Sequence, residues 1–282
     1  MALESMPPLV LVSTRYTISG LLMLAAAWAS GKHIPRGREL WITARNGVIV
    51  LGIGNGCLAF AEQWIPSGLA ALFITLSPFW MIAIEAAVPG GEPLHGPTIA
   101  GMVVALVGVG LLVTPAAQSG GFHGAVLVGF MVLQLGCAGW CFGSILQRRQ
   151  PTRAHPAISG AVQQLATGLV FAVPALATPS NPVHWSAGST LAVMYLVVFG
   201  SIVGYSAYIY AMDRLPVAVV SIYNYINPIV AVFLGWLFYR EPFGWREMAG
   251  MAIIFAGVAI VKRFGRSHAP QPPAPAVTES AA

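Results

Sequence analysis

Three polar side chains stand close together in an otherwise apolar stretch of the sequence. Tyr223 and Asn224 precede Asn227 by four and three residues, so a helix would carry all three on one face, together with Val220. Phenol and amide groups bind polar molecules through hydrogen bonds. Each would cost about 1 to 3 kcal/mol if it were left unsatisfied in hydrocarbon. The pattern therefore predicts either a polar cavity or a hydrogen-bonded ladder between helices.

Two matching stretches each carry a proline inside a predicted helix. Pro228 follows Asn227, and Pro78 follows Ser77 in a stretch that lies 150 residues earlier. An internal proline removes one backbone hydrogen bond and kinks the helix, which membrane helices tolerate where neighbours or cavity water satisfy the freed groups. We expect a cavity beside the kinks, with polar contacts mainly from the second stretch and an aromatic surface opposite. The aromatic candidates are Phe73, Phe79 and Trp80.

Arg15 lies about two turns inside the first apolar stretch. A charge at the centre of a bilayer costs about 2.5 to 3.5 kcal/mol on insertion scales, and less near the interface. Either the long side chain reaches the outer surface, or it lines the cavity or pairs with Glu4 or Glu62. Its counterpart in the second half, Gln164, is also polar, which favours the bundle interior. The predicted cavity residues are Arg15, Ser77, Pro78, Trp80, Tyr223, Asn224, Asn227 and Pro228.

The other chemistry-bearing residues fit no catalytic or metal site. All six histidines fall in loops or at the ends of apolar stretches, without ligand spacing among them. Cys57, Cys137 and Cys141 are scattered within apolar stretches, where a small buried hydrophobe is the favoured role. The run Gly204-Tyr205-Ser206 has only a faint likeness to an intramembrane serine nucleophile, and no histidine is embedded to serve it. We expect no cofactor, no metal and no enzymatic activity.

The composition is that of a membrane protein. The 282 residues are 57% hydrophobic and 8% charged, whereas soluble domains carry about 25% charged residues. An apolar run of about 20 residues spans the hydrocarbon as a helix. The net charge of +5 lies in loops between such runs, which indicates topology and no nucleic-acid partner. The nine predicted spans are residues 8–29, 42–63, 66–88, 96–115, 121–147, 157–177, 188–212, 216–239 and 245–264.

Prolines recur at a constant offset, which indicates an internal duplication. Pro66 and Pro216 are 150 residues apart, and Pro93 and Pro242 are 149 apart. Four predicted spans precede residue 120 and five follow it, so the first half is one helix short. The complete fold would hold ten helices in two inverted five-helix halves, with the first helix missing here. The expected units are residues 1–119, residues 120–264 and a disordered cytoplasmic tail, residues 265–282.

Four stretches of the sequence resemble a known family. They are AEQWIPSGLAALFITLSPFW, YAMDRLPVAVVSIYNYINPIVAVFLG, REPFGWREMAGMAIIFAGVAIV and PPLVLVSTRYTISGLL, the last of which contains Arg15. Together they resemble the EamA repeat of the drug/metabolite transporter superfamily. The resemblance covers residues 5–264 and occurs twice.

This resemblance implies an all-helical transporter of the bacterial inner membrane. It implies ten helices, a central cavity, and export of amino acids, metabolites or drug-like compounds by alternating access. The expected partners are a small-molecule substrate and the lipid bilayer, and a homodimer stays open. A lipid-linked substrate flippase of the same superfamily is the alternative, although Arg15 is the one candidate for binding its phosphate. An intramembrane enzyme is a third and less favoured reading.

The basic residues set the expected orientation, because cytoplasmic loops carry an excess of Lys and Arg. Eleven of the fourteen fall on one side of the predicted spans, so we expect the carboxyl terminus in the cytoplasm and the amino terminus outside. The eleven are Lys32, Arg36, Arg38, Arg45, Arg148, Arg149, Arg153, Arg214, Lys262, Arg263 and Arg266.

Single cysteines in a cysteine-free background test this orientation. A cysteine at Ser119 should react with a membrane-impermeant thiol reagent added outside, because this loop lies opposite the basic loops. A cysteine at Gln150, beside Arg148 and Arg149, should stay unlabelled in intact cells. The measurement is the extent of labelling before and after the membrane is permeabilised. The reverse pattern would contradict the orientation and the inverted halves that depend on it.

Overall fold

Helices alone make up the regular structure of the described residues. The computed structural model describes residues 6–65, 70, 73–91, 93, 95–118, 124–150, 152–177, 186–215, 217–227, 229–230 and 244–264. No strand occurs in these ranges, and five helices are long and apolar enough to cross a membrane. The expectation of an all-helical membrane protein is confirmed.

The described helices fall into two groups along the chain, before and after residue 120. The first group is α2 (Pro8–Ala29), α3 (Gly37–Gly47), η1 (Val48–Ile53), α4 (Gly54–Ala61), α6 (Ser77–Ala87) and α7 (Gly96–Gln118). The second is α8 (Gly124–Arg149), α9 (Pro156–Ala177), α10 (Ala187–Tyr195), η2 (Leu196–Tyr205), α11 (Ser206–Arg214), α12 (Val217–Val220) and α14 (Trp245–Phe264).

Five of the predicted spans correspond to the five long apolar helices. These are α2, the continuous rod from α3 to α4, α8, α9, and the continuous rod from α10 to α11. In α7 and α14 the apolar parts are shorter, Gly96–Leu111 and Met248–Val261. The predicted spans at 66–88 and 216–239 fall only partly within the described residues. The count of nine spans therefore stays a prediction.

Two π-helical segments occur at matching places in the two halves. The segment η1 lies between α3 and α4, and η2 lies between α10 and α11. Adding the offset of 149 residues found for the prolines moves Val48–Ile53 to positions 197–202, inside η2. π-helical turns are rare and occur often at functional sites. The duplication thus extends from the proline pattern to the local backbone.

Helices α2 and α9, which occupy matching positions in the two halves, pack against each other. Ser19 donates a 2.5 Å hydrogen bond to Gln164, and Ser13 donates to the carbonyl of Gly168 at 3.0 Å. A Cβ on Gly20 would lie 2.6 Å from the backbone nitrogen of Leu165, so the glycine allows the two backbones to approach closely. Later residues of α2 thus contact earlier residues of α9, so the two helices are antiparallel.

The second matched pair, α7 and α14, is held by glycines in the same way. A Cβ on Gly101 would lie 2.8 Å from the carbonyl oxygen of Gly257, and a Cβ on Gly108 would lie 2.7 Å from that of Gly250. The two helices are again antiparallel. Side-chain size at these positions therefore limits how closely the helices approach.

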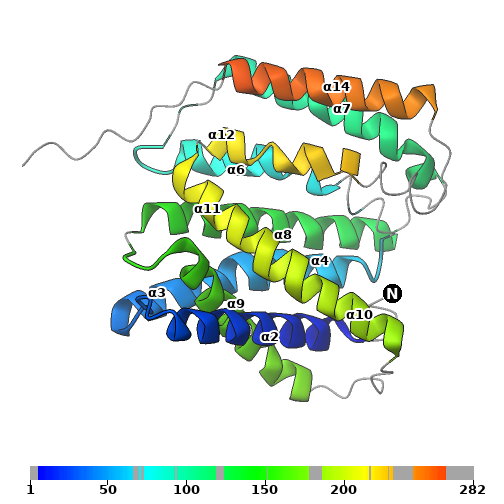
Figure 1. Cartoon of the computed structure of the whole chain (residues 1–282). Coiled ribbons are helices and arrows are strands. Elements are labelled where there is room, and N and C mark those ends of the chain that lie inside the picture. The colour runs from blue at the N-terminus through cyan, green and yellow to red at the C-terminus, as the bar shows by residue number, and fades with distance from the viewer. Residues whose placement is uncertain are drawn as a thin grey trace, which may run out of the picture.

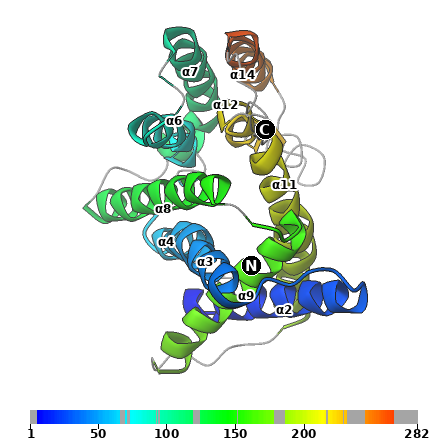
Figure 2. The ribbon, with the colours of Figure 1, turned by 90° about the vertical axis from the view of Figure 1, so that its left-hand side faces the viewer.

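The two matched pairs lie at opposite ends of the described structure. Figures 1 and 2 show α7 and α14 side by side at one end and α2 crossing α9 at the other, with α8 and α4 between them. Helix α8 packs closely on α4, because a Cβ on Gly136 would lie only 3.0 Å from the carbonyl oxygen of Gly54. The rod that ends in α11 connects the lower and upper parts.

The glycine contact between α7 and α14 can be tested with a matched pair of substitutions. Gly108→Ala should destabilise the protein by about 1 to 3 kcal/mol, because the new methyl group meets the carbonyl of Gly250. Gly110→Ala is the control, since among the described residues its Cβ would meet no heavy atom within 4 Å, and alanine favours a helix over glycine by up to about 1 kcal/mol. Thermal unfolding in detergent should separate the two variants. Equal melting temperatures would contradict the close approach.

Candidate functional site

The largest cavity described lies between the first and second halves of the chain. Its volume is about 680 Å³, and its walls come from α2, η1, α4, α8, η2, α11, α12 and the residues that follow α12. Three of the predicted residues, Arg15, Tyr223 and Asn227, line it. Apolar and aromatic side chains form most of the remaining wall. Cavities of this size and composition, with a few convergent polar groups, are typical of small-molecule sites.

Arg15 is directed into this cavity by a contact with η2. Its Nε donates a 2.7 Å hydrogen bond to the hydroxyl of Ser201, and its guanidinium passes beside Gly200, where a Cβ would lie 2.8 Å from Nη2. Among the described residues Arg15 has no ion-pair partner, so Glu62 is not paired with it. Gln164, the counterpart of Arg15, is fully buried and bonds to Ser19 and to the Ser201 carbonyl.

A second cavity adjoins the first. Its volume is about 200 Å³, and it shares Asn55, Trp140, Tyr223 and Asn227 with the larger cavity. Two more of the predicted residues, Ser77 and Asn224, line this second cavity. The Asn224 side chain is 2% exposed, and its Oδ1 has no hydrogen-bond partner among the described residues. A buried acceptor of this kind is available to a bound molecule.

Two of the other predicted residues, Trp80 and Pro78, do not line either cavity. Trp80 does not line either, and its Nε1 donates a 2.9 Å hydrogen bond to Oε1 of Gln134. Pro78 is buried but does not line either cavity, and Pro228 lies outside the described residues. Phe73 packs edge-on against Phe130, with ring centroids 4.8 Å apart. None of the three aromatic candidates, Phe73, Phe79 and Trp80, lines either of the two cavities.

Trp140 and Tyr208 supply the aromatic wall instead. The Trp140 Nε1 donates to the Tyr208 hydroxyl at 2.9 Å, and that hydroxyl donates to Ser144 at 2.8 Å. Tyr208 also meets Tyr223 edge-on, with ring centroids 5.5 Å apart. The sequence offered a signal for Asn55 and Tyr208, as polar side chains in apolar stretches. It offered no comparable signal for Trp140, an aromatic side chain within an apolar stretch.

A side-chain amide donates a hydrogen bond at the helix break before Pro78. The chain makes a turn at residues 75–76, and the Gln134 amide donates to the Phe73 carbonyl at 3.2 Å. In the second half, residues 221–222 form a turn, and the Asn224 amide donates to the Ser221 carbonyl at 3.4 Å. In both halves the helix breaks near the cavity, and a carbonyl at the break accepts a side-chain amide in addition to a backbone N–H.

Within the described lining of both cavities, Arg15 is the one side chain that carries a full charge. Its guanidinium uses one donor on Ser201, which leaves further N–H groups for a carboxylate, phosphate or carbonyl oxygen. The described residues contain no group of three or more metal-ligating side chains. The arrangement is suited to binding an amphipathic molecule with a polar or anionic end.

A family model covers most of the chain. The model described as the EamA-like transporter family matches residues 1–114 and residues 127–263. The two matches correspond to the two halves of the internal duplication, and they confirm the resemblance that the sequence motifs suggested. The family consists of transporters and not of enzymes.

Relatives with similar sequences are transporters as well. The "Uncharacterized inner membrane transporter YedA" of Escherichia coli (strain K12) is 31% identical over 260 residues, which cover 92% of this chain and 82% of the relative. The "Probable terminal-alkyne amino-acid exporter" of Streptantibioticus cattleyicolor is 26% identical, with coverage of 89% and 82%. A solved crystal structure superimposes with a TM-score of 0.78 at 23% identity, covering 92% of this chain and 88% of that one, which shows the fold.

The role of Gln134 at the helix break predicts a loss of stability on substitution. Gln134→Leu should destabilise the protein by about 1 to 3 kcal/mol, because it removes the donor to Phe73 and the acceptor for Trp80. Trp80→Phe should cost less, since the bond to Phe73 remains. Melting temperatures in detergent measure both effects. A Gln134→Leu variant as stable as the parent would contradict this account.

Proposed function

Because the chain belongs to the EamA-like transporter family, we propose that it exports small metabolites, amino acids or drug-like compounds through the central cavity by alternating access. The observation that carries the proposal is the convergence of polar side chains from both halves on that cavity. Arg15 and Asn55 come from the first half, and Tyr223 and Asn227 come from the second. A site built between two halves opens to either side when the halves move against each other.

The contacts between matched helices support two inverted halves of one repeated unit. The pair α2 and α9 and the pair α7 and α14 are each antiparallel, as two copies with opposite orientation require. We place the first unit at residues 1–119 and the second at residues 120–264. Both units contain a π-helical segment and a broken helix beside the cavity.

The chemistry of the wall supports one class of substrate. Arg15 offers N–H donors, Asn224 offers a buried acceptor, and Trp140 and Tyr208 form an aromatic surface between them. These groups suit a molecule with an anionic or carbonyl end and an apolar body. The amino-acid exporter among the relatives supports this class and supports export as the direction.

The proposed location is the inner membrane of a bacterium, in line with the inner membrane transporter among the relatives. The excess of basic residues on one side supports a cytoplasmic carboxyl terminus. Arg148 and Arg149 at the end of α8, and Arg214 at the end of α11, would then lie at the cytoplasmic surface.

Substitutions of the polar cavity residues test the function. Tyr223→Phe and Asn227→Ala should impair transport by about tenfold or more, because each removes a hydrogen-bonding group from the wall. Arg15→Gln should have a similar effect, since it removes the one charge in the described lining. Ser77→Ala is the matched control in the first half and should have the smaller effect. The measurement is uptake of labelled amino acids and metabolites by proteoliposomes that contain each variant.

Melting curves of the same variants distinguish a substrate site from a structural ladder. We expect melting temperatures within a few degrees of the parent for Tyr223→Phe and Asn227→Ala. A loss of stability in proportion to the loss of transport would show that these residues hold the helices together. The substrate path would then have to be placed elsewhere.

A further inference from the structure

The π-helical segment η2 contacts the Arg15 side chain at two neighbouring positions. Nε of Arg15 donates a 2.7 Å hydrogen bond to the hydroxyl of Ser201, and a Cβ on Gly200 would lie only 2.8 Å from Nη2. Arg15 and Gly200 both line the central cavity, and Ser201 is fully buried. A larger residue at position 200 would therefore displace the guanidinium from this wall.

Ser201 is itself fixed by buried neighbours. Its backbone carbonyl accepts a 3.3 Å hydrogen bond from Nε2 of Gln164, and Oε1 of Gln164 accepts a 2.5 Å hydrogen bond from the hydroxyl of Ser19. All three residues are fully buried. The acceptor for Arg15 is thus in place before any ligand binds, so binding requires little reorganisation of this wall.

The ring of Tyr16 also contacts the guanidinium. The Cζ atom of Arg15 lies 5.0 Å from the centroid of this ring, within the range of a cation–π contact. Tyr16 is buried and lines the central cavity as well. The guanidinium is therefore held by a ring and a hydroxyl, while its two Nη groups donate no hydrogen bond to the described residues.

The two halves of the duplication differ at this place. At an offset of 149 or 150 residues, Gly200 corresponds to Leu51 or Val50, which are both buried and large. Arg15 corresponds to the neutral Gln164 at the offset of 149. The arginine and the glycine that makes room for it therefore occur together, whereas the matching place has an amide and a large apolar side chain.

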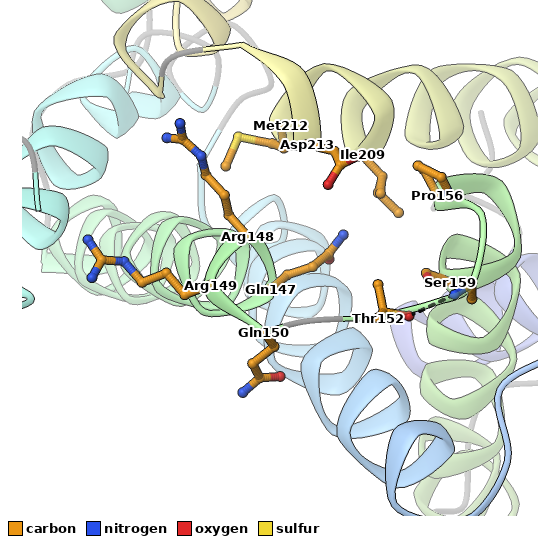
Figure 3. A pocket seen from close by; sticks show the side chains of 11 residues that line it. Gln147, Arg148, Arg149, Gln150, Thr152, Pro156, Ser159, Ile209, Met212 and Asp213 are labelled. Atoms are coloured by element: carbon orange, nitrogen blue, oxygen red, sulfur yellow. Dashed lines mark hydrogen bonds between the residues drawn. The ribbon is translucent and has the colours of Figure 1, made fainter. Parts of the chain in front are cut away.

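The charges nearest along the chain to this wall do not neutralise Arg15. Asp213 on α11 lines a separate pocket of about 350 Å³, which shares no lining residue with the central cavity. Figure 3 shows Asp213 at that pocket, with the side chains of Arg148 and Arg149 extending away from it. A cation in a largely apolar wall is costly unless an anion or water accompanies it.

We propose that Gly200 and Ser201 are positioning residues that hold Arg15 as an anion site, and that the central cavity therefore takes organic anions such as carboxylates. An anionic group neutralises the guanidinium and accepts hydrogen bonds from its Nη groups, whereas a neutral carbonyl leaves the charge uncompensated. The identity of the ligand as a transported anion rests on the proposed function. The anion site itself does not.

A reporter cysteine measures the charge of the cavity directly. The full chain, with Cys57, Cys137 and Cys141 replaced by alanine, carries Ala207→Cys at an exposed position of the cavity wall. In detergent it reacts with anionic sulfonatoethyl methanethiosulfonate or with the cationic trimethylammonioethyl reagent. The charge ratio is the anionic rate constant divided by the cationic one. Arg15→Gln should lower this ratio by about three- to tenfold, because the positive charge acts on the two reagents in opposite directions.

Gly200→Ala and Ser201→Ala test the positioning roles. Each should lower the charge ratio by about threefold, because the guanidinium leaves the wall that carries the reporter. Gly204→Ala is the matched control in the same segment and cavity wall, since its Cβ would meet the Phe199 carbonyl and not Arg15. It should leave the charge ratio unchanged. In Gly200→Ala the new methyl group meets the end of a flexible side chain, so its melting temperature should stay within a few degrees of the parent's.

The outcomes separate the anion site from the proposed function. Equal charge ratios in the parent and in Arg15→Gln would overturn the anion site. An effect of Arg15→Gln without any effect of Gly200→Ala and Ser201→Ala would overturn the positioning roles. Preferential uptake of neutral or cationic compounds by proteoliposomes would overturn the ligand class, while the proposed transport function would stand.

Discussion

Polar groups within a membrane bundle have to be satisfied by other parts of the protein, because hydrocarbon offers no hydrogen bonds. In this chain the buried glutamines perform much of this task. Gln134 covers the carbonyl of Phe73 at a helix break, Gln163 connects Tyr205 with Gln147, and Gln164 joins Ser19 to the backbone of η2. The helices are thereby fixed in register, and the Asn224 oxygen, which has no partner among the described residues, lies at the smaller central cavity.

The position of the central cavity follows from the sizes of side chains along the bundle. At its two ends, glycines allow antiparallel helices to approach almost backbone to backbone, as at Gly20 of α2 and Gly108 of α7. Between these ends, the rings of Trp140 on α8 and Tyr208 on α11 are joined by a hydrogen bond, and their size keeps the two helices apart. Close packing at the ends and large rings in the middle leave a space that polar residues of both halves surround.

The helix breaks give the site its polarity. Each half interrupts a helix close to a proline, and at each break a side-chain amide donates to a carbonyl that also accepts from a backbone N–H. The second half places Tyr223, Asn224 and Asn227 beside the cavities, whereas the first half contributes Ser77. The duplication therefore produced a similar backbone in both halves, while later differences in side chains made the wall unequal.

The sequence alone determined the class, the duplication and the family, because apolar length, proline spacing and motif likeness are properties of a linear chain. It also placed Tyr223, Asn224 and Asn227 on one face, since helical periodicity relates neighbours within one helix. Which helix meets that face was decided by the tertiary structure. Trp140 lines the central cavity, and Trp80 donates a hydrogen bond to Gln134. Arg15 bonds to Ser201 and is not paired with Glu62. Such contacts join residues up to 186 positions apart, and they depend on close packing that no local pattern encodes.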